Sequence, residues 1–263
     1  MDLAKISDEF MRLLRLRTYP VAVKYFTEFN EDIEADLLDR GFVKPGEPLT
    51  VCQIVALARY HQRSSYFTAE DMACIVGAVS QGMHPPSADD MEWGYVARTL
   101  HKDLESTRKF LKDVTRIKHG EVKAVACSPL HKTLIDPDQI IFYGNSLQTL
   151  RLIQGHLWDK DEPVRFKSFG EFCLCSDIMA KGYITKSFVV GIPCMGERTS
   201  AMTGDDELTV GIPLKDLNRV LEGIRATADV APYPVKCGGL NRTPIYFPEY
   251  LLTEHAKGRG RGG

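Results

Sequence analysis

The chain has 263 residues, of which 44% are hydrophobic and 26% charged, and its net charge at pH 7 is -2. This length and composition are typical of a globular protein with one large domain or two small ones. The near-neutral charge balance produces no overall field that would attract nucleic acid or an anionic membrane surface, so we expect neither as a partner.

The first segment, residues 2–17, predicts an amphipathic helix because its apolar residues recur at helical spacing. A secretory signal would begin with basic residues and continue as an unbroken apolar stretch, whereas this segment carries acids near its start. No apolar run elsewhere reaches the roughly 18 residues that a membrane-spanning helix needs. We therefore expect a cytoplasmic protein without membrane attachment.

The rest of the first half reads mainly as helices. Strands are expected where β-branched and aromatic residues alternate, and helices where apolar residues recur at helical spacing behind a capping residue such as Thr68. The expected elements are a strand at 18–26, a helix ending at Gly41, a strand-to-helix or helix element at 49–62, a helix from Thr68 to Gly82 and a long helix at 91–114.

The second half alternates strands with helices. Asn145 and Gln148 have the spacing of a capping box that opens a helix. The expected elements are strands at 121–130, 139–144, 162–169, 187–194 and 207–213, and helices at 146–158, 173–183 and 214–230.

This alternation predicts an α/β (or α+β) fold, in which a layered sheet has flanking helices and a helical N-terminal part packs on a C-terminal sheet. The unbroken apolar run FVVGI predicts a central strand that is buried on both faces. We expect a single compact domain, with a possible division into lobes at 1–118 and 119–250. The basic, glycine-rich tail at 255–263 predicts disorder.

Familiar catalytic and nucleotide-binding motifs are missing from the sequence. It has neither a G-x-G-x-x-G loop nor a Walker lysine loop, and it has no H-E-x-x-H, C-x-x-C or G-x-S-x-G motif. Function must therefore be sought in less familiar patterns.

The chain contains seven cysteines, an odd number. Stable disulfides are rare in a reducing compartment, so metal binding or catalysis competes with simple burial as the reason for these thiols. We expect a structural role for Cys127, on an apolar strand, and for Cys237, in a glycine-flanked turn, because free cysteines are among the most often buried residues.

Five other cysteines lie where thiols can serve chemistry. Cys74 is expected in the first turns of a capped helix, where the helix dipole lowers a thiol pKa. Cys173 and Cys175 follow a strand-to-helix bend. Cys194 ends the expected central strand, at the edge where open α/β sheets bind ligands. Cys52, in the element at 49–62, is the fifth.

Several uses of these thiols remain open. Iron–sulfur clusters are held by cysteine thiolates, usually four. Zinc prefers C-x₂₋₄-C knuckles, which the C-x-C spacing here matches poorly. The cysteines could also be plain core residues. A single nucleophilic cysteine would need a base, for which His61, His84 and His131 are the candidates.

Charged residues near the cysteines provide candidates for substrate binding and proton transfer. Glu197 and Arg198 are expected on a loop after Cys194, where Arg198 could clamp a carboxylate or phosphate. Glu171 precedes the C-x-C pair and could donate a proton. Arg59 and Arg63 are expected one turn apart on a helix, where they bind an anion or line a wet face.

Four sequence blocks in order resemble the prokaryotic family catalogued as domain of unknown function number 169. The blocks are AEDMACIVGAVSQG, QIIFYGNSLQTLRLIQG, GEFCLCSDIMA and VVGIPCMGERTSAMTGDDELTVGIPLKDLNRVLEGI. The resemblance covers most of the chain, from about the first strand to the last long helix. It implies that Cys74, one cysteine of the C-x-C pair and the P-C-x-G-x-R block from Cys194 to Arg198 are usual features. The family is common in archaea and anaerobic bacteria, which favours an oxygen-sensitive cluster by analogy.

We therefore expect a cytoplasmic protein whose cysteine-thiolate site binds an iron–sulfur cluster or a related metal. Cys74, Cys175 and Cys194 would be ligands, and Cys173 or Cys52 would complete the set. The protein would act as an enzyme or enzyme subunit of anaerobic metabolism, in redox or lyase chemistry.

In this hypothesis Arg198 orients a small anionic substrate and Glu171 or Glu197 moves protons. One alternative is a metal-free accessory or small-anion-binding protein with core cysteines. A second alternative is a cysteine-nucleophile transferase. A homo-oligomer or a partner enzyme is possible in each case.

Overall fold

The structure, a computed structural model, describes residues 1–86 and 100–234. Its centre is an antiparallel sheet. The strands in these ranges are β1 (Val21–Phe26), β2 (Ser65–Phe67), β3 (Ala124–Pro129), β4 (Gln139–Gly144), β5 (Val189–Gly191) and β6 (Leu208–Pro213). They lie side by side in the order β2-β3-β1-β4-β6-β5.

Helices flank this sheet, and the predicted mixed class of helix and sheet is confirmed. The α-helices are α1 (Leu3–Leu14), α2 (Glu31–Asp39), α3 (Val51–His61), α4 (Ile75–Ser80), α6 (Leu104–Lys112), α7 (Ser146–Leu157), α8 (Lys181–Thr185), α9 (Met195–Ala201) and α10 (Leu214–Ala226). Two 3-10 turns, η1 (Ala69–Asp71) and η2 (Leu130–Lys132), and the π-helix η3 (Cys173–Ala180) complete the list.

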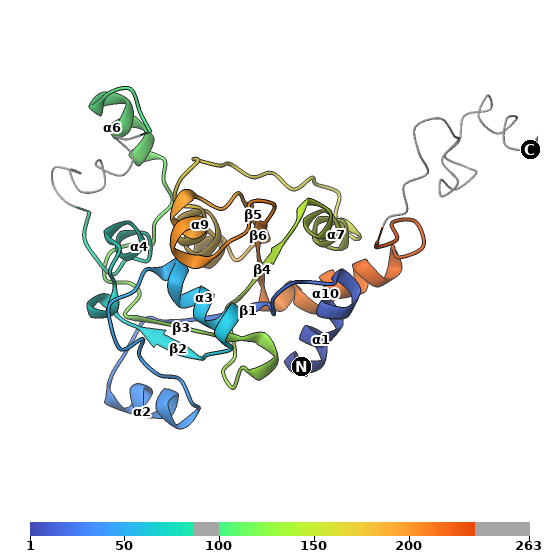
Figure 1. The fold of residues 1–263 in the computed structure, drawn as a ribbon, viewed down its shortest axis with the longest axis horizontal. Helices are drawn as coiled ribbons and strands as arrows, with labels where there is room; N and C mark the ends of the chain where they lie inside the picture. Colours follow the sequence, from blue (N-terminus) through green and yellow to red (C-terminus); the bar gives the residue numbers. More distant parts are fainter. Residues whose placement is uncertain (87–99, 235–263) are drawn as a thin grey trace, which may run out of the picture.

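Both faces of the sheet are covered. Along β4, Ile141 and Tyr143 pack into the core beneath α3 and η3, whereas Ile140 and Phe142 pack into the core beneath α1, α7 and α10. Figure 1 shows α1, α7 and α10 grouped on one side and α3, α4 and α9 on the other. Because both faces of the sheet are covered, most strand positions are apolar, with exceptions such as Lys24 in β1 and Gln139 in β4.

Local capping explains where several helices begin. Asn145 and Gln148 form the predicted capping box of α7, with each side chain accepting a hydrogen bond from the backbone of the other. Thr50 and Gln53 form an equivalent box that starts α3. The expected helix before Gly41 is confirmed as α2, and Gly41 has a φ of 78°, a conformation that glycine adopts without strain.

The predicted helix from Thr68 to Gly82 is wrong in its first part. Thr68 and Asp71 form a capping box, but it supports only the short turn η1. The backbone is then extended at Met72 and again at Cys74, which is the residue that precedes α4. Cys74 therefore lies before the helix rather than inside its first turns.

Two predicted strands also differ from the structure. Residues 162–169 form a mostly exposed segment outside the six-stranded sheet of the described residues. The run FVVGI contributes only the short strand β5 at the edge of the sheet, so the expected central position is wrong. Its burial on both faces is correct, since Val189 and Val190 pack into the two different cores.

Because the strands pair in antiparallel fashion, the argument from strand ends for a ligand site at Cys194 no longer holds. In a parallel sheet all strand carboxyl ends share one edge, but in this sheet they alternate between edges. The position of Cys194 at the end of a strand therefore does not by itself indicate a ligand site.

Some predictions lie outside the described residues: the part of the predicted 91–114 helix at 91–99, Cys237 and the tail at 255–263. In its described part, the predicted continuous helix is wrong at residues 100–103, which form a turn and bend before Asp103 caps the separate helix α6. The suggested lobes at 1–118 and 119–250 share one sheet, because β1 pairs with both β3 and β4.

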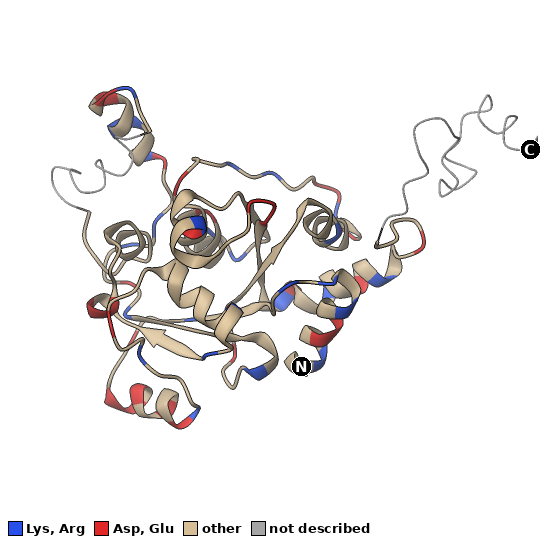
Figure 2. Cartoon of the chain, in the orientation of Figure 1, with Lys and Arg blue, Asp and Glu red and all other residues tan. Residues whose placement is uncertain are grey.

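Charged residues of both signs lie on the outer helices and on the segment between α7 and η3, while α2 is mainly acidic (Figure 2). Across the two described ranges, every helix is too short or too polar to cross a membrane.

Glycines allow α7 and α10 to cross closely. A Cβ atom on Gly223 would lie 2.2 Å from the carbonyl oxygen of Gly155. At an exposed helix position, replacing glycine by alanine raises the free energy of unfolding by up to about 1 kcal/mol. At Gly223 the steric overlap of the added methyl group with Gly155 should outweigh this gain. We predict that Gly223→Ala lowers the free energy of unfolding by about 1–3 kcal/mol, measured by urea denaturation. The exposed control Lys215→Ala should cause little change, and a stabilised Gly223→Ala protein would contradict this packing.

Candidate thiol site

The five candidate cysteines converge on one region from four separate segments. Cys52 lies in the first turn of α3, Cys74 and Cys194 directly precede α4 and α9, and Cys173 and Cys175 lie in the first turn of η3. We call this group the thiol site. Each of its members thus lies at the beginning of a helix, where backbone N–H groups have no partner within the helix.

The five thiols pack in two apolar clusters, with Cys52, Cys173 and Cys194 in one and Cys74 and Cys175 in the other. Burial raises the pKa of Cys52, and the Glu197 carboxylate and the thiols of Cys175, Cys194 and Cys74 raise it further. By contrast, Cys127 lies in β3, and burial alone raises its pKa to about 12. The prediction of a structural role for Cys127 agrees with its position in the core.

The segment that carries the C-x-C pair has an unusual backbone. Most π-helical segments are short bulges, often at functional sites, whereas η3 spans eight residues. Phe172 before it has a φ of 61°, which is uncommon for a buried aromatic residue. Its carbonyl accepts hydrogen bonds from the backbone N–H groups of both Ser176 and Asp177.

Glu197 holds the cysteine-bearing segments together. Its side chain is fully buried, and Oε2 accepts hydrogen bonds from the backbone N–H groups of Leu174 (3.2 Å) and Cys194 (3.1 Å). Tyr143 of β4 donates its hydroxyl hydrogen to Oε1 at 3.2 Å. Burial raises the pKa of Glu197, and these donors, together with the thiol of Cys173, oppose the rise.

Glu197 also forms a capping box with Cys194. The sulfur of Cys194 accepts a hydrogen bond from the backbone N–H of Glu197, in the role that serine or threonine usually plays. The predicted loop after Cys194 is therefore wrong: Glu197 and Arg198 lie on helix α9. The spacing C-x-x-E is the sequence signal for this box.

A buried ion pair lies behind Tyr143. The guanidinium of Arg59 stacks on the Tyr143 ring at 3.5 Å and donates to Glu207 Oε1 at 2.9 Å. Glu207 Oε2 accepts a further hydrogen bond from the backbone N–H of Gly204. Arg59 and Glu207 are only 2% and 4% exposed, so this pair is part of the interior. Sequence reasoning missed Tyr143 and Glu207.

The predicted arginine sites are engaged within the protein. Arg63 lies beyond the end of α3 and donates to the Lys44 carbonyl, so it does not share a helix face with Arg59 as predicted. Arg198 donates to the Gly204 carbonyl and lies 3.8 Å from an oxygen of Asp205. Neither arginine is oriented toward the thiols by these contacts.

Two other acids lie next to the thiol site. Burial raises the pKa of Glu171, whose charge in turn raises the pKa of Cys194. Asp177, which sequence reasoning missed, is buried, and Oδ2 has no hydrogen-bond partner among the described residues. Burial raises the pKa of Asp177 to about 7.

Burial disfavours the thiolate form of Cys173, Cys175 and Cys194. Burial raises the pKa of Cys173 and Cys175, and it raises that of Cys194 to about 11. A nucleophilic cysteine needs a lowered pKa or an adjacent base. His61 ends α3, roughly 13 Å along the helix from Cys52, and His131 stacks on Tyr19 beside α1.

The donor set was tested against a metal. Five thiols are soft ligands of the kind that select iron–sulfur clusters, zinc or copper(I), so their chemistry fits. Within residues 1–86 and 100–234, no three cysteine, histidine, aspartate or glutamate side chains already surround one point as a single ion requires. In a [4Fe–4S] cluster each thiolate binds a different iron, so the ligands lie farther apart than those of a single ion.

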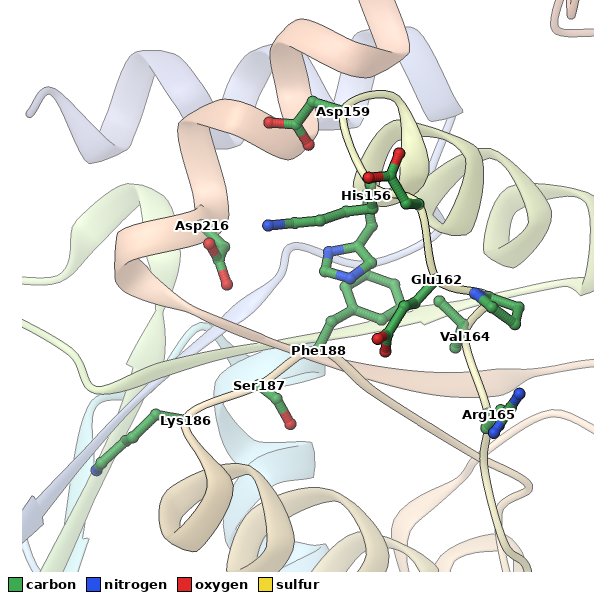
Figure 3. Close-up of a pocket in the computed structure, with 12 residues that line it drawn as sticks. His156, Asp159, Glu162, Val164, Arg165, Lys186, Ser187, Phe188 and Asp216 are labelled. Atoms are coloured by element: carbon green, nitrogen blue, oxygen red, sulfur yellow. The ribbon is translucent and has the colours of Figure 1, made fainter.

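A separate cavity of about 780 Å³ lies between the segment after α7 and the start of β5 (Figure 3). The His156 ring stacks on Phe188 with 4.3 Å between ring centres. The lining includes acidic residues such as Glu162 and Asp216 and basic residues such as Arg165 and Lys186. Because the lining contains both acidic and basic side chains, it favours neither anionic nor cationic ligands.

Comparison with known proteins identifies the family. The family described as "Uncharacterised ArCR", domain of unknown function number 169, matches residues 9–223. The chain belongs to this family. The resemblance seen in the sequence is thereby confirmed.

One relative of this family member is the "Uncharacterized protein MJ0308" of Methanocaldococcus jannaschii. The two are 27% identical over 229 residues, which cover 85% of this chain and 95% of the relative. No solved structure matches the chain.

Substitution of Glu207 and of its sequence neighbour Asp206 gives a matched test of the buried ion pair. Glu207→Ala would leave Arg59 buried without its carboxylate, so we predict a loss of about 3–5 kcal/mol in the free energy of unfolding. Asp206→Ala removes the partner of Arg17 in a pair whose side chains are 60% and 50% exposed, and it should change stability little. Equal effects of the two substitutions in urea denaturation would contradict this assignment.

Asp177 should make stability depend on pH. Its pKa in the native state, about 7, exceeds the ordinary value of 3.8, so the native state keeps a proton that the unfolded chain loses between these values. Stability is therefore lost as pH rises through this window. We predict that Asp177→Asn stabilises the metal-free protein at pH 8, by on the order of 4 kcal/mol, and much less at pH 4.

Denaturation of both proteins at the two pH values measures this difference. The exposed control Asp161→Asn should show no such pH-dependent gain. A constant difference between Asp177→Asn and the wild type would rule out a raised native pKa.

Proposed function

We propose that this protein uses the thiol site to bind an iron–sulfur cluster in the cytoplasm, as a redox enzyme or an enzyme subunit. The observation that carries the proposal is the convergence of five cysteines from α3, α4, η3 and α9. Cys52, Cys173 and Cys194 pack in one apolar cluster and Cys74 and Cys175 in a second, and a cluster held by thiolates needs several cysteines from separate segments in one region. When bound, such a cluster would supply one-electron transfer.

Several residues of the chain support this function. The backbone N–H of Glu197 donates to the sulfur of Cys194. Hydrogen bonds of this kind to sulfur ligands tune the potential of a cluster. Cys52 and Cys74 are partly exposed, so the site is closer to solvent on the α3 and α4 side than at η3.

A metal-free accessory protein is the second candidate. It is favoured by the raised pKa of the Cys173 and Cys175 thiols, because the thiolate and not the thiol binds metals. In that case the five cysteines would be a polarizable part of the core, and a small anion or partner protein would bind elsewhere.

The test is the iron and acid-labile sulfide content of protein purified without oxygen. We predict both elements in near-equal amounts, with a broad visible absorption band. Cys175→Ala should lose most of this iron, because it removes a proposed ligand. The control Cys127→Ala alters an equally buried thiol outside the site and should retain it.

A colourless wild-type protein without iron or sulfide would contradict the proposal and favour the metal-free candidate. The same conclusion would follow if Cys127→Ala and Cys175→Ala retained equal iron. Elemental analysis of the same samples for zinc separates a single-ion site from a cluster.

A further inference from the structure

A second cavity, with a volume of about 260 Å³, lies beside helix α3. Within the described residues it shares no lining residue with the cavity of Figure 3. Its walls come from the turn at 45–49, from one face of α3 and from the end of α9, where Ser200 and Met202 lie. Small-molecule sites commonly have volumes of about 300–1,000 Å³, so this smaller cavity is matched to a ligand of amino-acid size.

The floor of this cavity is apolar. Ala56 and Leu57 contribute to it from α3, and Leu49 contributes from the segment just before the helix. Ala56 is only 6% exposed, whereas Met202 at the edge of the cavity is 58% exposed. An aliphatic group that lies against these side chains removes apolar surface from water, which favours its binding.

Arg63 provides the cationic group of the lining. Its side chain is half-buried, and Nη2 donates to the Lys44 carbonyl at 2.8 Å, which fixes the guanidinium in place. In residues 1–86 and 100–234 no carboxylate pairs with this guanidinium, so Nε and Nη1 keep their donors for a ligand. Two N–H donors on a planar guanidinium match the two oxygens of a carboxylate. His61 also borders the cavity and, neutral or cationic, does not oppose an anionic group there.

Glu47 provides the anionic group. It lines the same cavity as Arg63, yet the two side chains do not form an ion pair with each other, and Glu47 has no other ion pair in the part of the chain that the structure describes. In the cavity of Figure 3, by contrast, Asp159 and Asp216 already pair with Arg219. Opposite charges that border one small cavity without pairing are complementary to a ligand that carries both charges.

We propose that this cavity binds a free α-amino acid with an aliphatic side chain. Arg63 donates to the carboxylate of the ligand, and Glu47 accepts from its ammonium group. The side chain of the ligand lies on the apolar floor formed by Leu49, Ala56 and Leu57. No cysteine lines the cavity, so this site is independent of the proposed cluster.

The test is isothermal titration calorimetry of the full-length protein with L-leucine, L-valine and L-methionine. We expect saturable binding of at least one of them, with one molecule bound per chain. Two analogues of leucine separate its charges: isocaproate lacks the ammonium group and isoamylamine lacks the carboxylate. Each analogue leaves one charged side chain of the cavity without a partner, so each should bind at least about tenfold more weakly than leucine.

Matched variants locate the bound amino acid. Arg63→Met and Glu47→Gln should each weaken its binding by about tenfold or more, because each removes one charged partner. The controls Arg108→Met and Glu28→Gln remove exposed charges that do not line the cavity, and they should bind as the wild type does. Urea denaturation of each variant confirms that it folds, and Glu47→Gln, on an exposed turn, keeps the test valid if Arg63→Met does not.

Three results would overturn the proposal. If none of the three amino acids binds saturably, the cavity is not an amino-acid site. If isocaproate binds as tightly as leucine, Glu47 does not take part and the ligand is a simple carboxylate. If the folded Arg63 and Glu47 variants retain wild-type affinity, the amino acid binds elsewhere. None of these results depends on iron, so they leave the cluster proposal unaffected.

Discussion

The buried carboxylate of Glu197 is the interaction on which the candidate site depends. It accepts hydrogen bonds from the start of η3, the start of α9 and the side chain of Tyr143 on β4, so one side chain joins two cysteine segments to the sheet. A buried carboxylate is costly unless its oxygens are satisfied, and here each oxygen has at least one donor. The position of α9, and with it Cys194, follows from this set of bonds. Tyr143 extends the network to the ion pair of Arg59 and Glu207, which anchors α3 to the turn before β6.

The covered antiparallel sheet provides the rigid base for these contacts. Helices on both faces make β3, β4 and β6 continuously buried, a pattern usually associated with parallel sheets. The site then forms on one face only, where α3, α4, η3 and α9 all begin. Two unusual backbone features lie on this face. Phe172 has a left-handed conformation, and directly after it the π-helix η3 begins with the C-x-C pair. Strained backbone is retained where the surrounding structure or a function requires it.

Local signals in the sequence were sufficient for much of the fold. The capping box at Asn145 and Gln148 and the apolar runs of β4 and β6 depend on near neighbours, so they could be predicted. The strand order could not, because continuous burial does not distinguish parallel from antiparallel pairing. Residues 162–169 have a strand-like sequence, yet they lie outside the sheet that the described residues form, and no local pattern indicates this. The cysteines were identifiable as candidates, whereas their convergence, and the Arg59–Glu207 pair across 148 positions, are long-range contacts that no local pattern encodes.

The proposed cluster requires that cysteines of the thiol site bind iron through sulfur. X-ray absorption spectroscopy at the iron edge, on protein purified without oxygen, measures the atoms around iron most directly. The account predicts a first shell of sulfur and a second shell of iron, as in a cluster held by cysteine thiolates. A first shell dominated by oxygen or nitrogen, or a protein that contains no iron, would contradict it.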